Sequence, residues 1–214
     1  MKIAVLGSGG WGTALAMVLL ENGHDVTLWS YSEDESKVLR ETGENPMLKG
    51  VALPETLKLT SDMACVKGCG AVVLATPSFA VRETARKLAD LLDPETILIS
   101  VSKGIEKDTS LTLTQVIASE VGEKVKIVAL SGPSHAEEVG RRVPTTVVAA
   151  SRDQAAAELV QDLFMNPRFR VYASDDVVGV ELAAALKNVI ALSAGVCDGM
   201  GFGDNTKAAL MTRG

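Results

Sequence analysis

Short apolar runs alternate with amphipathic stretches along most of the chain. The apolar runs predict strands at residues 2–6, 25–29, 71–75, 96–100, 126–130 and 145–150, with a weaker strand at 169–172. The stretches between them have helical spacing and predict helices at residues 11–21, 33–42, 79–92, 111–121 and 154–164. Strands that alternate with helices in this way are typical of βαβ units around a parallel sheet, so the fold class is α/β.

The pattern changes in two places. Residues 43–59, with Pro46, Gly50 and Pro54, predict a long connection around a short strand. After residue 173 the strands cease, and residues 175–197 predict one long helix, followed by a glycine-rich turn and the start of another helix. We therefore expect a domain of residues 1–173 and the beginning of an all-helical second domain at residues 174–214.

The first predicted strand leads directly into a glycine-rich loop. Gly7, Gly9 and Gly12 form G-x-G-x-x-G between that strand and an alanine-rich helix. Gly7 permits the tight turn, Gly9 lets the backbone approach a pyrophosphate, and Gly12 lets the helix pack on the strand. Because a second strand follows, the motif predicts a dinucleotide site in a Rossmann-type doubly wound, mainly parallel sheet. The alternative is a glycine-rich turn without a ligand.

Lys187 lies in a predicted helix that is apolar almost all the way round, so we expect it to be buried. No neighbour three or four residues away on that helix can pair with its charge. Desolvation lowers the pKa of a lysine toward the range of proton transfer, which makes Lys187 a candidate general acid and base. The alternative is a lysine whose ammonium group extends to water.

Three loops at the carboxyl ends of predicted strands carry further candidates, since ligands bind there in doubly wound sheets. Residues 76–78 either lie beside a cofactor or cap the next helix. Lys103 either contacts a phosphate or carbonyl oxygen, or is a solvated loop lysine. The small residues of 131–138 suit a substrate cradle, and Ser134 lacks the triad of a serine hydrolase. Residues 198–205 suit either a ligand or a flexible turn.

Bulk properties narrow the class of function. The net charge of −6 and the absence of a basic run argue against nucleic acid. No apolar stretch looks long enough to span a bilayer, and the first residues predict a strand rather than a signal peptide, so we expect a cytoplasmic protein without membrane insertion. Three cysteines without zinc spacing and two histidines predict no metal site.

Six segments together resemble the bacterial-type NAD(P)-dependent glycerol-3-phosphate dehydrogenases, and they occur in that family's order. They are GSGGWGTA (7–14), SKGIE (102–106), SGPSHAEE (131–138), GVE (179–181), ALKN (185–188) and TRG (212–214). Trp11 within the glycine loop and the adjacent Lys187 and Asn188 are the most specific features. The resemblance implies reversible reduction of dihydroxyacetone phosphate, a small phosphorylated triose, to sn-glycerol 3-phosphate with NAD(P)H, which feeds glycerophospholipid synthesis.

The same resemblance implies residue roles. Lys187 corresponds to the catalytic lysine, Lys103 to a lysine that contacts both cofactor and substrate, and Gly132, Ser134 and Asn188 to substrate contacts. The implied cofactor contacts are Gly10, Trp11, Tyr31 and Ala136. Residues 30–32 end the second strand without the acid that NAD-selective folds place there, which predicts use of NADPH or of both cofactors.

Family members continue beyond residue 214 with helices that supply an aspartate and a phosphate-binding stretch. We therefore expect this chain to be a fragment that is inactive alone, and a homodimer is possible for the full-length protein. Two alternatives stay open: a related 3-hydroxyacid or 3-hydroxyacyl dehydrogenase, and a non-catalytic dinucleotide-sensing module.

Overall fold

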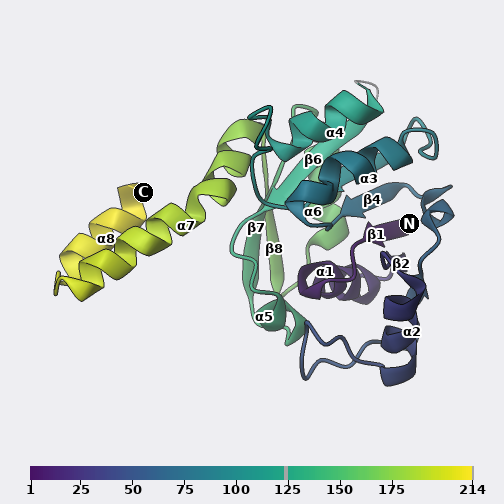
Figure 1. Ribbon diagram of the computed structural model, residues 1–214, viewed down its shortest axis with the longest axis horizontal. Helices are drawn as coiled ribbons and strands as arrows, with labels where there is room; N and C mark the ends of the chain where they lie inside the picture. The colour runs from purple at the N-terminus through teal and green to yellow at the C-terminus, as the bar shows by residue number, and fades with distance from the viewer. Residues whose placement is uncertain (123–124, 214) are drawn as a thin grey trace.

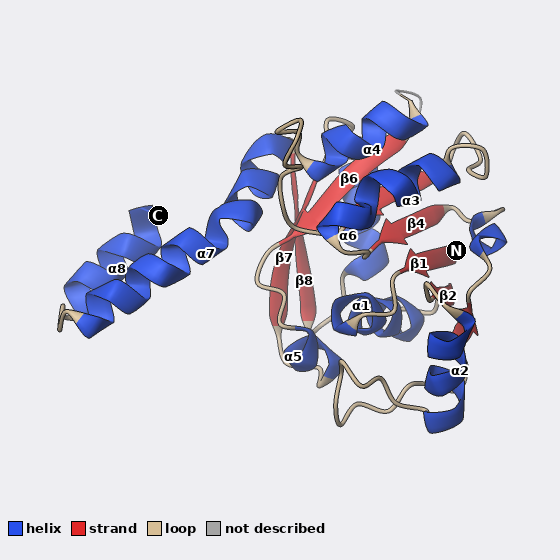
Figure 2. Cartoon of the chain, in the orientation of Figure 1, coloured by secondary structure: helices blue, strands red, loops and turns tan. Residues whose placement is uncertain are grey.

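One eight-stranded sheet forms the centre of the molecule (Figure 2). The computed structural model describes residues 1–122 and 125–213. The strand order is β3-β2-β1-β4-β5-β6-β7-β8, and every neighbouring pair is parallel except β6 with β7. The strands are β1 Lys2–Leu6, β2 Asp25–Trp29, β3 Lys58–Thr60, β4 Ala71–Leu74, β5 Ile97–Ser100, β6 Lys126–Ser131, β7 Thr145–Ala150 and β8 Phe169–Ser174. This arrangement confirms the Rossmann-type, mainly parallel sheet.

The chain reverses its direction of travel across the sheet next to β1. It runs outward from β1 through β2 to β3, and then returns to place β4 on the other side of β1. The connections therefore leave β1 and β4 on opposite faces, which opens a crevice at their carboxyl ends. The glycine-rich loop follows β1 at that edge.

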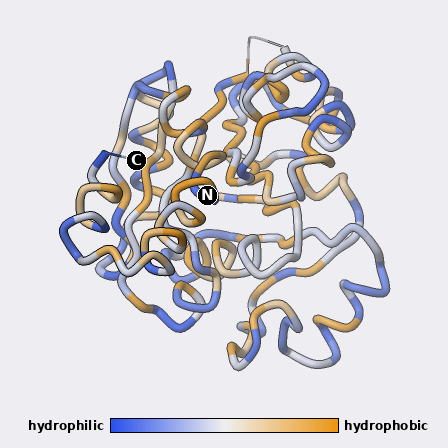
Figure 3. Tube along the Cα trace, turned by 60° about the vertical axis from the view of Figure 1, so that its left-hand side comes forward, coloured by the Kyte–Doolittle hydropathy of each residue, from blue (hydrophilic) through white to orange (hydrophobic). Residues whose placement is uncertain are grey.

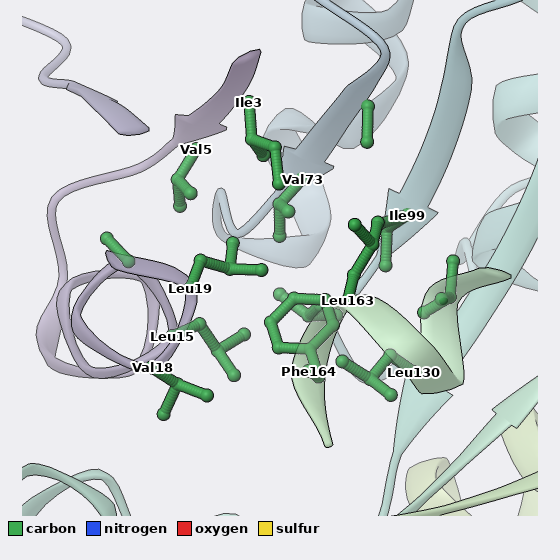
Figure 4. Close-up of a cluster of buried hydrophobic side chains, with 14 of the residues drawn as sticks. Ile3, Val5, Leu15, Val18, Leu19, Val73, Ile99, Leu130, Leu163 and Phe164 are labelled. Carbon is green, nitrogen blue, oxygen red and sulfur yellow. The ribbon is translucent and has the colours of Figure 1, made fainter. Parts of the chain in front are cut away.

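Helices cover both faces of the sheet (Figure 1). The α-helices are α1 Gly10–Glu21, α2 Glu33–Thr42, α3 Val81–Leu88, α4 Leu113–Val121, α5 Ala136–Gly140, α6 Gln154–Phe164, α7 Val177–Gly199 and α8 Asp204–Arg213, and two 3₁₀ turns are η1 Met63–Val66 and η2 Ser78–Ala80. Alternate residues of a strand point to opposite faces of the sheet. Because helices cover both faces, the central strands contribute apolar residues to a core on each side. Ile3 and Val5 pack in one core with Leu19 and Phe164 (Figure 4). Ala4 and Leu6 of the same strand point to the other face and pack in a second core with residues of α3 and α4.

Element ends differ from the prediction in several places. The strand expected within 43–59 is β3, which lies at the end of that connection rather than in its middle. The helix expected at 79–92 is η2 followed by the shorter α3. The helix α3 ends at Leu88, but Leu91 and Leu92 beyond it still pack against the core. Because these two leucines continue the apolar spacing of the helix, the sequence pattern predicted a helix that is too long. A short helix that was not among the predicted ones, α5, follows β6.

The two last helices project from the sheet (Figure 1). The first part of α7 contacts β6 and β7, and its later part lies against α8. Glu181 is the only residue of α7 that is buried, and Leu192 is 71% exposed. The expectation that this helix is buried is therefore wrong for the described residues. The apolar pattern of α7 indicates a surface that is suited to burial. It does not indicate which residues bury that surface, and residues 1–122 and 125–213 leave most of it exposed. Figure 3 shows the hydropathy along the trace.

By length and composition α7 is also long and apolar enough to cross a membrane, with a mean hydropathy of 1.6 over 18 of its residues. The expectation that no stretch reaches that length is therefore wrong. Core helices of soluble proteins can have the same length and composition. Glu181 and Lys187 both lie within the helix, and they make it a poor match for hydrocarbon.

Candidate functional site

A cavity of about 800 Å³ opens at the carboxyl ends of β1, β2, β4 and β5. Its walls include the glycine-rich loop, Tyr31 after β2, residues 76–78 after β4 and Lys103 after β5. This is the place where the reversal of chain direction predicts a ligand. Of the two interpretations of residues 76–78, the structure favours a place in the cavity wall: no side chain caps η2, and Thr76 Oγ1 is buried without a partner.

Gly7 and Gly12 of the loop must be glycine because neighbouring backbone leaves no room for a side chain. Gly7 has a φ of +118°, and a Cβ there would lie 2.6 Å from the carbonyl oxygen of Ala75. A Cβ on Gly12 would lie 1.9 Å from the carbonyl oxygen of Gly7, so only glycine lets α1 pack this closely on the strand. Around Gly9 the space is open, since a Cβ would meet only Met47 Sδ at 3.9 Å. Backbone at Gly9 is thus accessible from the cavity.

The start of α1 fits a pyrophosphate. The helix begins at Gly10, its N-cap Gly9 makes no side-chain cap, and its first turn has no acidic side chain. The first N–H groups of a helix have no partner within the helix, and together with the helix dipole they favour an anion. The indole Nε1 of Trp11 is a further buried donor that has no hydrogen-bond partner. The residues present therefore fit the dinucleotide that the motif implies.

Asn45 holds the loop in shape, and no sequence pattern indicated this role. It is 2% exposed, and its Nδ2 donates to the carbonyl oxygen of Ser8 at 2.8 Å and to Thr13 Oγ1 at 2.7 Å. Its Oδ1 accepts from the N–H of Met47 at 2.8 Å. A single asparagine in a long connection has no distinctive pattern, so only the folded chain reveals that it reaches the glycine loop.

The cavity wall at the end of β2 carries hydroxyl groups rather than an acid. Tyr31 is 82% exposed, and its ring stands edge-on to Trp29 at 6.3 Å between centroids. Ser30 Oγ is buried without a partner, whereas Ser32 Oγ caps α2 by accepting from the N–H of Glu35. Lys87 also lines the cavity and forms an ion pair of 2.6 Å with Glu83.

Lys103 brings together the loops after β5 and β6. Its Nζ donates to the carbonyl oxygen of Gly132 at 2.8 Å and to Ser134 Oγ at 2.5 Å. Burial lowers the pKa of Lys103 from its ordinary value, and the positive charge of Lys187 lowers it further. A half-buried ammonium that already contacts two acceptors suits a carbonyl or phosphate oxygen better than it suits open solvent.

The remaining predicted residues lie around this cluster. Gly132 has a φ of +152°, and a Cβ there would lie 2.9 Å from Val147 Cα. Ala136 begins α5 beside Gly10, since its Cβ would lie 3.5 Å from a Cβ added to that glycine. Gly132, Ser134 and Ala136 therefore connect the Lys103 end of the site with the glycine loop.

Lys187 is exposed rather than buried, which corrects the prediction. Its Nζ donates to Asn188 Oδ1 at 2.9 Å, so it has a neutral partner that the three- and four-residue spacing did not indicate. Among the described residues, nothing covers its side chain, which is open to solvent. Its positive charge nevertheless contributes, after burial, to the lowered pKa of Lys103.

The comparisons identify close relatives over the whole chain. The family model described as NAD-dependent glycerol-3-phosphate dehydrogenase N-terminus matches residues 2–157, and the model for the C-terminus of that family matches residues 176–214. The curated relatives include proteins named glycerol-3-phosphate dehydrogenase [NAD(P)+] from several bacteria. The protein from Moorella thermoacetica is 54% identical over 215 residues, and that from Bacillus subtilis is 48% identical over 217 residues. Each alignment covers all of this chain, but only 64% and 63% of the relative.

Solved structures give the same result. A glycerol-3-phosphate dehydrogenase from Coxiella burnetii superposes with a TM-score of 0.88 at 39% identity, covering 99% of this chain and 65% of that chain. One from Saccharomyces cerevisiae has a TM-score of 0.86 at 29% identity, covering 98% of this chain and 66% of that chain. The chain thus spans a little under two thirds of the length of the curated relatives that it matches.

Proposed function

The chain belongs to the NAD-dependent glycerol-3-phosphate dehydrogenase family, and we propose that the protein that carries it reduces dihydroxyacetone phosphate reversibly to sn-glycerol 3-phosphate. The main support is that a dinucleotide-sized cavity ends at Lys103, which is hydrogen-bonded to Ser134. The cavity that would hold the cofactor thus adjoins hydrogen-bond donors that would bind the oxygen atoms of a substrate. A dinucleotide-sensing module would have no use for the second feature.

NADPH or NADH would be held by the glycine loop, with Gly7, Gly9, Gly10, Trp11 and Gly12 around the pyrophosphate. Ala136 would lie beside Gly10, and Tyr31 would contact the cofactor at the end of β2. When bound, the nicotinamide supplies the hydride. The end of β2 offers hydroxyl groups but neither an acid for the ribose nor an arginine for a 2′-phosphate. We therefore propose use of both cofactors, or a mild preference for NADPH, which parallel titrations with the two cofactors would measure.

The substrate would lie between the loops after β5 and β6 and the exposed face of α7. Lys103, Gly132 and Ser134 would orient its oxygens, and Asn188 would hold the ammonium of Lys187. Lys187 would donate a proton to the carbonyl oxygen as the carbon is reduced, and would accept one from the hydroxyl in the reverse direction. Lys103 would stabilise the negative charge that develops on that oxygen.

Other properties of the whole protein belong to the same proposal. They are a division between residues 173 and 174, a cytoplasmic location without membrane insertion, a role in glycerophospholipid synthesis and a possible homodimer. The exposed apolar side of α7 supports the division, since a second helical unit would need such a face.

The test compares this chain with an extended protein, in which the chain continues through the additional length that its relatives possess. We expect the extended protein to oxidise NADPH in the presence of dihydroxyacetone phosphate. The 214-residue chain should bind the dinucleotide with little or no turnover, because its cavity is formed within the described residues but Lys187 lies open. Turnover with a 3-hydroxyacid instead would favour the related dehydrogenase, and binding without turnover by the extended protein would favour a sensor.

A further inference from the structure

Glu181 is the only charged residue of the described part of the chain that is buried, with 7% of its surface exposed. Its Oε1 accepts from the backbone N–H of Thr114 at 2.9 Å, and its Oε2 accepts from Thr114 Oγ1 at 2.5 Å. Thr114 lies in the first turn of α4, where backbone N–H groups lack partners within the helix. The carboxylate of α7 therefore caps another helix, and both bonds gain from its charge.

Glu181 lies less than two helical turns before Lys187 on α7. Ala184 is three residues after Glu181 and three before Lys187, so it neighbours each of them on the helix surface, while Glu181 and Lys187 are themselves about 120° apart around the helix axis. Glu181 and Ala184 line a small cavity of about 10 Å³ against Ser100 and Ser131, at the ends of β5 and β6. Ser100 Oγ and Ser131 Oγ are buried without partners, and the space is about that of one water molecule.

The strands that meet this cavity are those that carry the predicted substrate contacts. Lys103 follows Ser100 by three residues, and Ser134 follows Ser131 by three residues. The same step along α7 leads from Ala184 to Lys187. The contact of α7 with Ser100 and Ser131 therefore sets the position of the helix relative to the loops that carry Lys103 and Ser134. The influence of Lys187 on Lys103 is the expected result of that placement.

We infer that Glu181 is a positioning residue: its hydrogen bonds to Thr114 fix α7 across the ends of β5 and β6, so that Lys187 faces Lys103 and Ser134. This inference rests on the proposed function. Few other contacts could take over the task, since the packing of α7 on the sheet involves mainly β6 and β7 and its later turns are exposed. A displacement of about 1 Å at a reacting group can cost on the order of a hundredfold in rate.

The test uses the extended protein and variants at both ends of the link. Glu181→Gln and Thr114→Val should each lower kcat by about tenfold to a hundredfold and leave the Kd for NADPH within about twofold. The double variant should lose little more than either single variant, because one link is broken in each case. Thr114→Ser keeps the hydroxyl and should restore kcat.

Thr96→Val is the matched control. Thr96 is also a buried threonine, and its hydroxyl donates to the carbonyl oxygen of Cys69 at 2.8 Å near the opposite end of the sheet. It should lower the thermal midpoint as Thr114→Val does, but leave kcat unchanged. The inference is overturned if Glu181→Gln and Thr114→Val reduce kcat no more than Thr96→Val, or if their losses are fully additive.

A second measurement separates this inference from the proposed function. If the extended wild-type protein does not reduce dihydroxyacetone phosphate, the proposed function fails, and amide hydrogen exchange on the 214-residue chain still tests the anchor. Glu181→Gln should then speed exchange in the first turns of α7 at least tenfold more than Thr96→Val does. Equal exchange in the two variants would contradict the anchoring role, whatever the enzyme's substrate.

Discussion

The ammonium group of Lys103 has two acceptors and one like charge close to it. Gly132 and Ser134 accept its hydrogen bonds, while burial and then the charge of Lys187 disfavour its protonated form. A lysine in this state is ready to bind a negatively charged oxygen, because such an oxygen would offset the desolvation that the site imposes. The charge of Lys187 therefore adds to the effect of burial on Lys103.

Lys187→Met tests the roles of both lysines. In the 214-residue chain we expect the pKa of Lys103 to rise, because a nearby positive charge that opposed its protonation is gone. In the extended protein, kcat should fall by about three orders of magnitude while dinucleotide affinity stays within a few-fold. Nuclear magnetic resonance titration of ¹³C-methylated lysines and steady-state kinetics measure the two effects.

Lys126→Met is the control for this prediction. Lys126 is a half-exposed lysine that pairs with Asp153 at 3.2 Å, at the amino end of β6 and far from the cavity. It should change neither the titration of Lys103 nor kcat. Near-normal turnover of Lys187→Met would rule out Lys187 as the proton donor.

Asn45→Ala should loosen the glycine loop. The substitution leaves the carbonyl oxygen of Ser8 and the N–H of Met47 without their partner, which we expect to cost about 1–3 kcal/mol of unfolding free energy. Dinucleotide affinity should fall as well, because Gly9 and Gly10 adjoin the loosened segment. Urea unfolding and fluorescence titration measure these effects.

Asn166→Ala is a matched control for Asn45→Ala. Asn166 also orders a turn through its side chain, accepting from the N–H groups of Arg168 and Phe169, but it lies before β8. It should lower stability and leave dinucleotide affinity unchanged. If both variants bind dinucleotide as the wild type does, Asn45 has no special part in the site.

At the scale of elements, the arginines of α3 join three segments. Arg82 donates to both carboxylate oxygens of Glu106, in the loop after β5, and also pairs with Glu120 of α4. Hydrogen bonds from Arg82, and then from Thr109, lower the pKa of Glu106 from 4.5 to about 2. The stabilisation is fully present above the ordinary pKa of the carboxyl group and is lost as pH falls toward its pKa in the folded protein.

Glu106→Gln should therefore lower stability near neutral pH but not near pH 2. We expect the difference in urea midpoint between wild type and variant to shrink as pH falls from about 4.5 to about 2. The exposed Glu55, changed to glutamine, serves as the control and should show a much smaller difference across that range. A difference for Glu106→Gln that stays constant with pH would contradict the role of its charge.

Most elements of the sheet were predictable because the central strands β1, β2, β4 and β5 are short apolar runs that are buried on both faces. The glycine loop was equally predictable, since Gly7 and Gly12 are required by local geometry. Asn45 and Glu181 were not, because each acts on a segment that is distant in the chain. The exposure of Lys187 was also not predicted. An apolar pattern indicates that a helix is suited to burial, but not whether another segment covers the helix.

At the scale of the whole molecule, α7 and α8 present apolar side chains to solvent. Leu186, Val189 and Leu192 are 51%, 57% and 71% exposed. Exposed apolar surface of this extent favours association, so we expect the 214-residue chain to sediment faster as its concentration rises. Replacing Val189 and Leu192 with glutamine should weaken that trend.

Val38→Gln is the control for the sedimentation experiment, because it also replaces an exposed apolar side chain with glutamine. Val38 is 45% exposed on α2, on the opposite side of the molecule (Figure 1), and its replacement should leave association unchanged. Sedimentation as a single species at every concentration would show that the apolar side of α7 does not drive contact between chains.

The composition of the cavity wall also gives the protein an optical property. The chain has two tryptophans, Trp11 and Trp29, and both line the cavity. All indole emission therefore arises beside the place proposed for the dinucleotide, and none arises from a distant background. Reduced nicotinamide absorbs where indoles emit, so energy transfer would make cofactor occupancy visible as a loss of intrinsic fluorescence, without any added label.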